Sequence, residues 1–120
     1  MLIDGSNEAI SNYKKKFKVN IIYVPGVFEI PYVISKNLKK YDAFIALGCV
    51  IKGETPHFDF ISKSSIDAIM KLSIESKKPI GNGILTCLNK DQAIERADKS
   101  NKNKGKEAAN AAIELLINDN

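Results

Sequence analysis

The chain has 120 residues, of which 44% are hydrophobic and 27% are charged, and its formal net charge is +4 at pH 7. This length fits one domain and leaves no room for a second core. No apolar run approaches the ~20 residues of a membrane span, and the first residues lack the pattern of a signal peptide. The lysines are mixed with acids along the chain, which indicates a solvated surface rather than a nucleic-acid interface.

The two cysteines, Cys49 and Cys87, lie at the ends of apolar runs. This placement is typical of reduced thiols at strand ends rather than of a disulfide framework. The reduced thiols lead us to expect a cytoplasmic protein. The lack of a long apolar run and the mixed charges lead us to expect no membrane and no nucleic acid among its partners.

Helical and strand-like patterns alternate from the N-terminus. Leu2–Phe17 has apolar residues on one face and lysines in its last turn, which predicts an amphipathic helix. Val19–Val24 (VNIIYV) is β-branched and almost continuously apolar, as in a strand covered on both faces. Pro25 and Gly26 end this strand, and Phe28–Leu38 is the next predicted helix.

The central part of the chain predicts a strand, a helix and a second strand. Ala43–Ile51 is an apolar run that predicts a buried strand. His57–Ser76 predicts a long helix, with Met70 and Ile74 among its core residues. Ile80–Thr86 predicts a strand interrupted by two glycines, which usually mark the close approach of a ligand or a packed helix.

Two helices complete the chain. Asn89–Gln92 has the form of a capping box and opens a short helix that carries Arg96. A lysine-rich connection, Asp98–Lys104, leads to the last helix, where four alanines predict close packing: Ala108, Ala109, Ala111 and Ala112.

This order of elements predicts an α/β fold in which a parallel sheet has helices on both faces. Ligands of such sheets bind beyond the carboxyl ends of the strands. Three segments are expected at that edge: Pro25–Glu29, Cys49–His57 and Thr86–Cys87.

The stretch Gly48–Phe60 (GCVIKGETPHFDF) holds the only histidine. Thr55 is predicted as the N-cap and Pro56 as the first residue of a helix, which places His57 in the first turn. The free N–H groups and the dipole of a helix start attract phosphate or carboxylate. The stretch therefore predicts an anion site with a residue for proton transfer, although a surface histidine at a helix end fits the same residues.

Five stretches in this order resemble the 6,7-dimethyl-8-ribityllumazine synthase family: VPGVFEIP, YDAFIALGCVIKGETPHFDF, PIGNGILT, QAIERA and NKG. The resemblance implies a flavodoxin-like three-layer fold and a homopentamer with sites between subunits. It implies condensation of 5-amino-6-(ribitylamino)pyrimidinedione with 3,4-dihydroxy-2-butanone 4-phosphate, the penultimate step of riboflavin biosynthesis. The resemblance also implies that phosphate is released and that no cofactor or metal is needed.

The resemblance also assigns roles to single residues. His57 matches the family's proton-transfer residue. The residues that match the butanone phosphate site are Glu54 and Thr55, through their backbone, and Arg96. The residues that match the pyrimidine site are Val27, Phe28, Glu29, Cys49, Val50, Ile51, Asn82 and Lys104. Cys49 is expected to act through its backbone, and Asn82 stands where many members have phenylalanine.

The resemblance is incomplete at the N-terminus. Family members begin with a strand that lies centrally, between the strands matched by Val19–Val24 and Ala43–Val50. We therefore expect one domain over residues 1–120 that is N-terminally short. Its two flanking strands should lie one strand's width apart, with the backbone groups that face each other unpaired.

Two other interpretations fit parts of the sequence. A non-catalytic family member could bind flavin-like ligands or form a shell, but the presence of His57 and Arg96 argues against it. A small basic nucleic-acid-binding domain would show strongly salt-dependent binding to DNA or RNA.

Overall fold

The computed structural model describes residues 1–118; the last two residues of the expected domain lie outside this range. The elements, in chain order, are α1 (Leu2–Ser11), a 3₁₀ helix (Val27–Glu29), α2 (Ile30–Lys36), β1 (Phe44–Ile51), α3 (His57–Ser76), β2 (Ile80–Cys87), α4 (Lys90–Ala97) and α5 (Lys104–Ile117). None of the helices in the described range is both long and apolar enough to cross a membrane.

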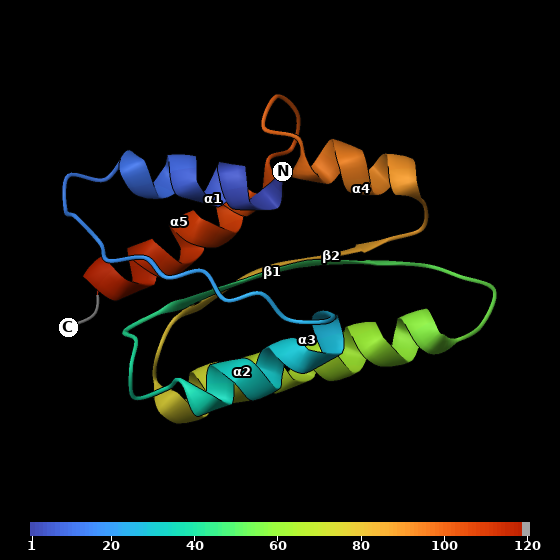
Figure 1. Ribbon diagram of the computed structural model, residues 1–120, viewed down its shortest axis with the longest axis horizontal. Helices are drawn as coiled ribbons and strands as arrows, with labels where there is room; N and C mark the ends of the chain where they lie inside the picture. Colours follow the sequence, from blue (N-terminus) through green and yellow to red (C-terminus); the bar gives the residue numbers. More distant parts are fainter. Residues whose placement is uncertain (119–120) are drawn as a thin grey trace.

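The two strands form a parallel sheet that separates two layers of helices. β1 and β2 pair along their full length, with Phe44 opposite Ile80 and Ile51 opposite Cys87. α1, α4 and α5 lie over one face, whereas α2 and α3 lie over the other (Figure 1). The predicted three-layer α/β fold with a parallel sheet is therefore confirmed.

The core between the sheet and the α2–α3 layer is made of five buried residues: Ile30, Ile34, Ala46, Ile69 and Ile84. The prediction that Met70 and Ile74 also face this core is wrong, because their side chains are 59% and 66% exposed. Successive helical residues are ~100° apart, so when Ile69 faces the sheet these two residues point away from it.

Close packing of α5 against the sheet explains the glycines of β2. A Cβ atom on Gly81 would collide with the backbone carbonyl of Ala108, and one on Gly83 would lie 3.0 Å from the Ala108 Cβ. The close approach predicted here is therefore that of a helix and not of a ligand. Three of the four alanines are buried as predicted, but Ala111 is exposed on the outer side of α5.

The first helix is shorter than predicted, because it ends at Ser11 and not at Phe17. The three consecutive lysines at 14–16 are exposed and outside the helix. Tyr13, two residues beyond the helix, packs on α5, where its hydroxyl donates a hydrogen bond to Glu114 Oε1 at 2.9 Å.

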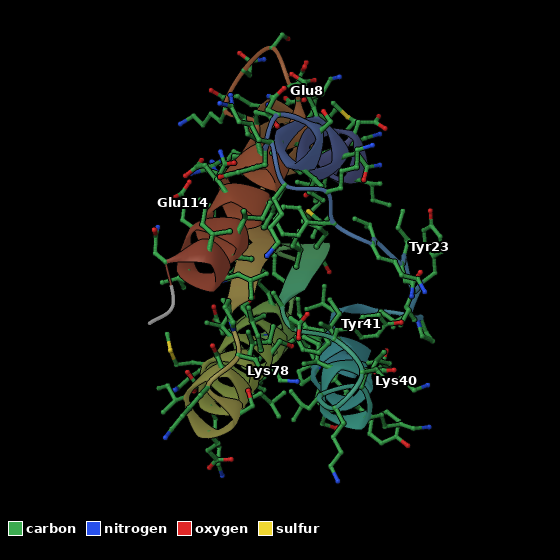
Figure 2. All side chains as sticks on the ribbon, turned by 90° about the vertical axis from the view of Figure 1, so that its left-hand side faces the viewer. Glu8, Tyr23, Lys40, Tyr41, Lys78 and Glu114 are labelled. Atoms are coloured by element: carbon green, nitrogen blue, oxygen red, sulfur yellow. The ribbon has the colours of Figure 1, made fainter. Side chains whose placement is uncertain are left out.

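The prediction of a strand at residues 19–24 is wrong. The segment is extended but lacks strand pairing, and within residues 1–118 no backbone hydrogen bond joins it to β1. Tyr23, which is 80% exposed, lies on the outer side of the molecule (Figure 2). An extended segment becomes a strand only when its backbone has a partner. The segment and β1 instead lie on opposite sides of a cavity, which fits the expected separation.

Between this segment and β1 the chain forms one interrupted helix. The predicted helix Phe28–Leu38 is a 3₁₀ helix followed by α2, which ends at Lys36. Pro31 lies in the first turn of α2, where the missing N–H of proline costs no hydrogen bond within the helix. The side-chain amide of Asn37 donates a hydrogen bond to the Val33 carbonyl at 2.7 Å, which closes the helix.

Candidate active site

The carboxyl end of β1 brings the three expected segments together. A Cβ atom on Gly48 would lie 2.7 Å from Val27 Cγ2, so glycine at this position permits the 3₁₀ helix to pack on the strand. Ile51 lies opposite Cys87, and the Lys52 N–H donates a hydrogen bond to the Cys87 carbonyl at 2.8 Å. The 3₁₀ helix and the ends of β1 and β2 therefore share one edge of the sheet.

An exposed turn connects this edge to α3. The helix begins at His57, and Pro56 occupies the N-cap position, one residue later than predicted. The Pro56 carbonyl accepts the first hydrogen bond of the helix, from the Asp59 N–H at 3.1 Å. The Thr55 hydroxyl still accepts from the His57 N–H at 3.4 Å. Glu54, Thr55 and His57 are all exposed. The turn therefore presents a helix N-terminus and the imidazole of His57 side by side to solvent.

Apolar side chains lie beside this turn. Phe28 and Ile51 are exposed, whereas Val50 is partly buried against the core of the α2–α3 layer. The Glu29 carboxylate folds back towards Gly26, whose Cβ position is 3.1 Å from Oε1 of Glu29. The edge thus presents an apolar surface next to a carboxylate.

Cys49 lies at this edge, where the residue is exposed but its thiol is partly desolvated. Burial raises the pKa of the Cys49 thiol, and the neighbouring Cys87 thiol raises it further. Both cysteines are free, and Cys87 is buried. Because the thiolate is the reactive form of cysteine, a raised pKa leaves less of this thiol in the reactive form than in an ordinary cysteine.

The two cationic residues predicted for the site, Arg96 and Lys104, lie on α4 and α5 and not at this edge. Arg96, on α4, donates a hydrogen bond from Nη1 to the Gln92 carbonyl of its own helix at 3.3 Å. Lys104 begins α5 and forms an ion pair with Glu107 at 2.9 Å. Both helices lie over the face of the sheet opposite α3, which carries His57 (Figure 1). A single chain therefore does not bring Arg96 or Lys104 to His57.

Asn82 is also separate from the carboxyl edge. It lies near the middle of β2, opposite Ala46, and its side-chain oxygen accepts a hydrogen bond from the Ile84 N–H at 3.0 Å. Its side chain is exposed. Asn82 therefore lies away from the carboxyl edge of its own chain and is open to solvent.

Comparison with known proteins identifies the group to which the chain is similar. A family model described as 6,7-dimethyl-8-ribityllumazine synthase matches residues 1–118. The chain belongs to the 6,7-dimethyl-8-ribityllumazine synthase family.

Three relatives that carry this name show how much of the lumazine synthase chain is matched. The protein of Zymomonas mobilis is 45% identical over 118 residues, which are 97% of this chain and 83% of the relative. That of Bartonella tribocorum is 44% identical over 118 residues, which are 96% of this chain and 77% of the relative. That of Corynebacterium kroppenstedtii is 46% identical over 98 residues, which are 80% of this chain and 62% of the relative.

Membership of the lumazine synthase family confirms the resemblance that the five sequence stretches indicated. Sequence reasoning misses one residue that positions the site, Gly48, whose lack of a side chain permits the contact with Val27. The signal was available, because a glycine inside an apolar strand marks close backbone approach. The roles of the individual residues in binding and catalysis stay predictions.

Proposed function

We propose that this chain condenses 5-amino-6-(ribitylamino)pyrimidinedione with 3,4-dihydroxy-2-butanone 4-phosphate to give 6,7-dimethyl-8-ribityllumazine. This is the penultimate step of riboflavin biosynthesis, and we place it in the cytoplasm. The observation that carries the proposal is the match to the lumazine synthase family over residues 1–118. That span includes His57 in an exposed helix start and Arg96 on an accessible helix.

The reaction needs proton transfer more than it needs a protein nucleophile. An amine of the pyrimidine and the ketone form an imine and release water, phosphate leaves, and the second amine closes the ring with loss of another water. Each step moves protons, for which the exposed His57 is the proposed shuttle. The remaining acceleration comes from holding the two substrates together in one orientation.

The phosphate of the butanone is proposed to bind at the start of α3. The backbone N–H groups of Glu54 and Thr55 serve there, with the Glu54 carboxylate turned away, because a carboxylate would repel a phosphate. Arg96 adds a guanidinium fork that suits a phosphate dianion. Since α3 and α4 lie on opposite faces of the sheet, this Arg96 is assigned to a neighbouring subunit.

The pyrimidine is proposed to bind at the carboxyl edge of β1. Its ring packs on Val27 and Phe28, its ribityl chain bonds to Glu29, and its polar edge meets the backbone of residues 49–51. Asn82 and Lys104 of the neighbouring subunit complete this half of the site. The assembly is proposed to be a homopentamer, in which every subunit gives one group of residues to each of two sites.

The direct test is to mix the purified chain with both substrates and to follow the absorbance and fluorescence of the lumazine. The proposal predicts product formation above the uncatalysed rate, together with stoichiometric release of phosphate. Size-exclusion chromatography of the same sample shows whether the chain is assembled. An assembled chain that gives no product above the uncatalysed rate would refute the proposed function.

A further inference from the structure

One end of the molecule, where the two strands begin, carries half of the cationic side chains. Its lysines follow α1, end or follow α2, or follow α3, and we call the group the basic pole: Lys14, Lys15, Lys16, Lys18, Lys36, Lys39, Lys40, Lys77 and Lys78. These are nine of the 18 lysines and arginines of the chain. They are far apart in the sequence, but α1, α2 and α3 all end on the same side of the molecule (Figure 1).

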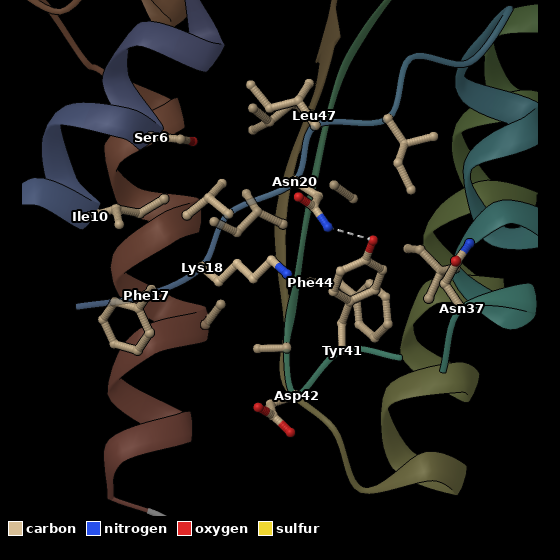
Figure 3. Close-up of a pocket in the computed structure, with 18 of the residues that line it drawn as sticks. Ser6, Ile10, Phe17, Lys18, Asn20, Asn37, Tyr41, Asp42, Phe44 and Leu47 are labelled. Atoms are coloured by element: carbon tan, nitrogen blue, oxygen red, sulfur yellow. Dashed lines mark hydrogen bonds between the residues drawn. The ribbon is translucent and has the colours of Figure 1, made fainter. Parts of the chain in front are cut away.

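Hydrogen bonds join the three segments of the basic pole. The Lys78 ammonium donates to the carbonyls of Leu38 and Tyr41, the latter at 2.9 Å, and so joins the end of α3 to the connection that follows α2. The Asn20 amide donates to the Tyr41 hydroxyl at 2.9 Å, which joins the segment after α1 to the same connection (Figure 3). Figure 2 looks onto this end of the molecule, with Lys40, Tyr41 and Lys78 labelled. The basic pole is therefore one surface made of three separate segments.

The charge of the basic pole is not balanced within the described residues. The acids at this end are Asp42, Glu75 and Glu114, so nine lysines and three acids leave a net charge of +6. All four ion pairs within residues 1–118 use lysines outside the basic pole: Lys63, Lys71, Lys99 and Lys104. The rest of residues 1–118 is nearly neutral, with nine cationic and ten acidic side chains. The charges that are mixed along the sequence, and that led us to expect no nucleic acid, are therefore separated in space.

Helix dipoles do not explain these lysines. A helix C-terminus carries a partial charge of about −0.5, so the four helices that end here, α1, α2, α3 and α5, contribute about −2 (Figure 1). The effect is confined to the last turn, and of the nine lysines only Lys36 lies in the last turn of a helix. A positive charge of about +4 is left over, which suits a partner with several negative charges.

Exposed aromatic rings among the lysines favour one kind of polyanion. Tyr23 is 80% exposed and Tyr32 is 65% exposed. The Lys36 ammonium lies 5.6 Å from the centroid of the Tyr32 ring, and that of Lys15 lies 6.0 Å from the centroid of the Phe17 ring. Proteins bind single-stranded nucleic acid with this combination, because cations contact the phosphates and aromatic faces stack on the bases. An acidic peptide or a layer of anionic lipid headgroups would use the lysines but would offer no bases to the rings.

We propose that the basic pole binds single-stranded nucleic acid. The lysine ammonium groups neutralise phosphates, and Tyr23, which lies on the same side of this end as Lys40, stacks on a base (Figure 2). The basic pole lies at the end of the strands opposite the carboxyl edge, where the substrates are proposed to bind. Nucleic-acid binding therefore needs no substrate and does not depend on the proposed enzymatic activity.

The first test uses the full chain and a fluorescein-labelled oligothymidylate of about 20 nucleotides, which exceeds the usual length of one binding site. Fluorescence anisotropy measures its affinity at salt concentrations from about 50 to 200 mM. One variant carries Lys14→Gln, Lys15→Gln and Lys16→Gln. Its matched control carries the same change at three exposed lysines outside the basic pole: Lys90, Lys102 and Lys106. For a single strand each phosphate contact contributes ~0.7 to the slope of log K against log salt. The first variant should therefore lower the slope by about 2 and the affinity at least about tenfold, whereas the control should change neither.

A second pair of variants tests whether the partner is nucleic acid. Tyr23→Phe keeps the ring and should bind the oligonucleotide as the original chain does, whereas Tyr23→Ala should bind at least about fivefold more weakly, because stacking on a base is lost. Unchanged binding by Tyr23→Ala would overturn the proposal, and so would equal losses in the two lysine variants. It is also overturned if the original chain does not bind the oligonucleotide at the lowest salt concentration, or binds vesicles of anionic lipid instead.

Discussion

His57 is the exposed first residue of α3, and the exposed turn from β1 precedes it. Replacing it with alanine removes the proposed proton shuttle but leaves the helix N–H groups and the substrate contacts. We predict that His57→Ala lowers kcat about 10²-fold, the lower end of general acid–base effects, and changes both KM values little. Steady-state kinetics of lumazine formation measure this. Complete loss of activity in a folded and assembled variant would show that His57 does more than transfer protons.

Arg96 differs from a lysine in geometry rather than in charge. A guanidinium bonds to a phosphate through two parallel N–H groups, whereas an ammonium acts as a point charge. We predict that Arg96→Lys raises the KM for the butanone phosphate about tenfold and leaves the KM for the pyrimidine unchanged. Initial rates at varied concentrations of each substrate separate the two. An unchanged KM for the butanone phosphate would remove Arg96 from the phosphate site.

The two thiols at the carboxyl edge should differ in reactivity. The pKa of Cys49 is raised by burial and then by Cys87, so the Cys49 thiol stays protonated to a higher pH than an ordinary cysteine. Its alkylation by iodoacetamide should therefore reach half its maximal rate above pH ~8.5, the value for a free cysteine. Mass spectrometry of labelled peptides follows each site. Cys87, buried, should stay unlabelled in the folded chain, and half-maximal labelling of Cys49 below that pH would contradict the assigned environment.

At the scale of elements, the contact between β2 and α5 depends on glycine. A Cβ on Gly81 would collide with the Ala108 carbonyl, which is backbone and cannot rotate away. We predict that Gly81→Ala lowers the free energy of unfolding by ~1–3 kcal/mol, the usual range for overpacking. The matched control is Gly53→Ala, because a Cβ on Gly53 meets no atom within 4 Å. Urea denaturation of both variants measures the difference, and equal stabilities would show that α5 packs less closely than described.

Elements with a clear apolar period were predictable from the sequence. α3 ends at Ser76 as predicted and begins at His57, one residue after the helix start expected at Pro56, and β1 and β2 each differ by one residue. Their residues satisfy the local pattern and the tertiary packing together. The end of α1 and the segment 19–24 were not predictable in this way. The first depends on a hydrogen bond to α5, and the second depends on whether a neighbouring strand is present.

The arrangement of the candidate site was likewise predictable from the sequence only in part. The meeting of the 3₁₀ helix, the end of β1 and the start of α3 follows from the rule that ligand sites form at the carboxyl edge of parallel strands. The positions of Arg96 and Lys104 relative to His57 do not follow from any local pattern. They depend on which face of the sheet each helix covers, and the sequence alone does not specify how neighbouring subunits then meet.

At the scale of the whole molecule, α3 presents an apolar surface to solvent. Phe60, Met70 and Ile74 are all exposed on this one helix. Exposed apolar patches on a helix are typical of surfaces that bind another protein chain. This surface, on the helix that carries His57, is where we expect a second copy to pack in the proposed assembly.

We propose that residues on opposite faces of the sheet form a site only between subunits. The most direct measurement is to mix the weakly active His57→Ala and Arg96→Ala chains at equal amounts, after unfolding and joint refolding. Each site then draws His57 from one subunit and Arg96 from its neighbour, so about a quarter of the sites should regain both residues. We predict recovery of about a quarter of the wild-type activity. Native mass spectrometry that shows mixed assemblies with no recovered activity would contradict the claim and place both residues in a site within one chain.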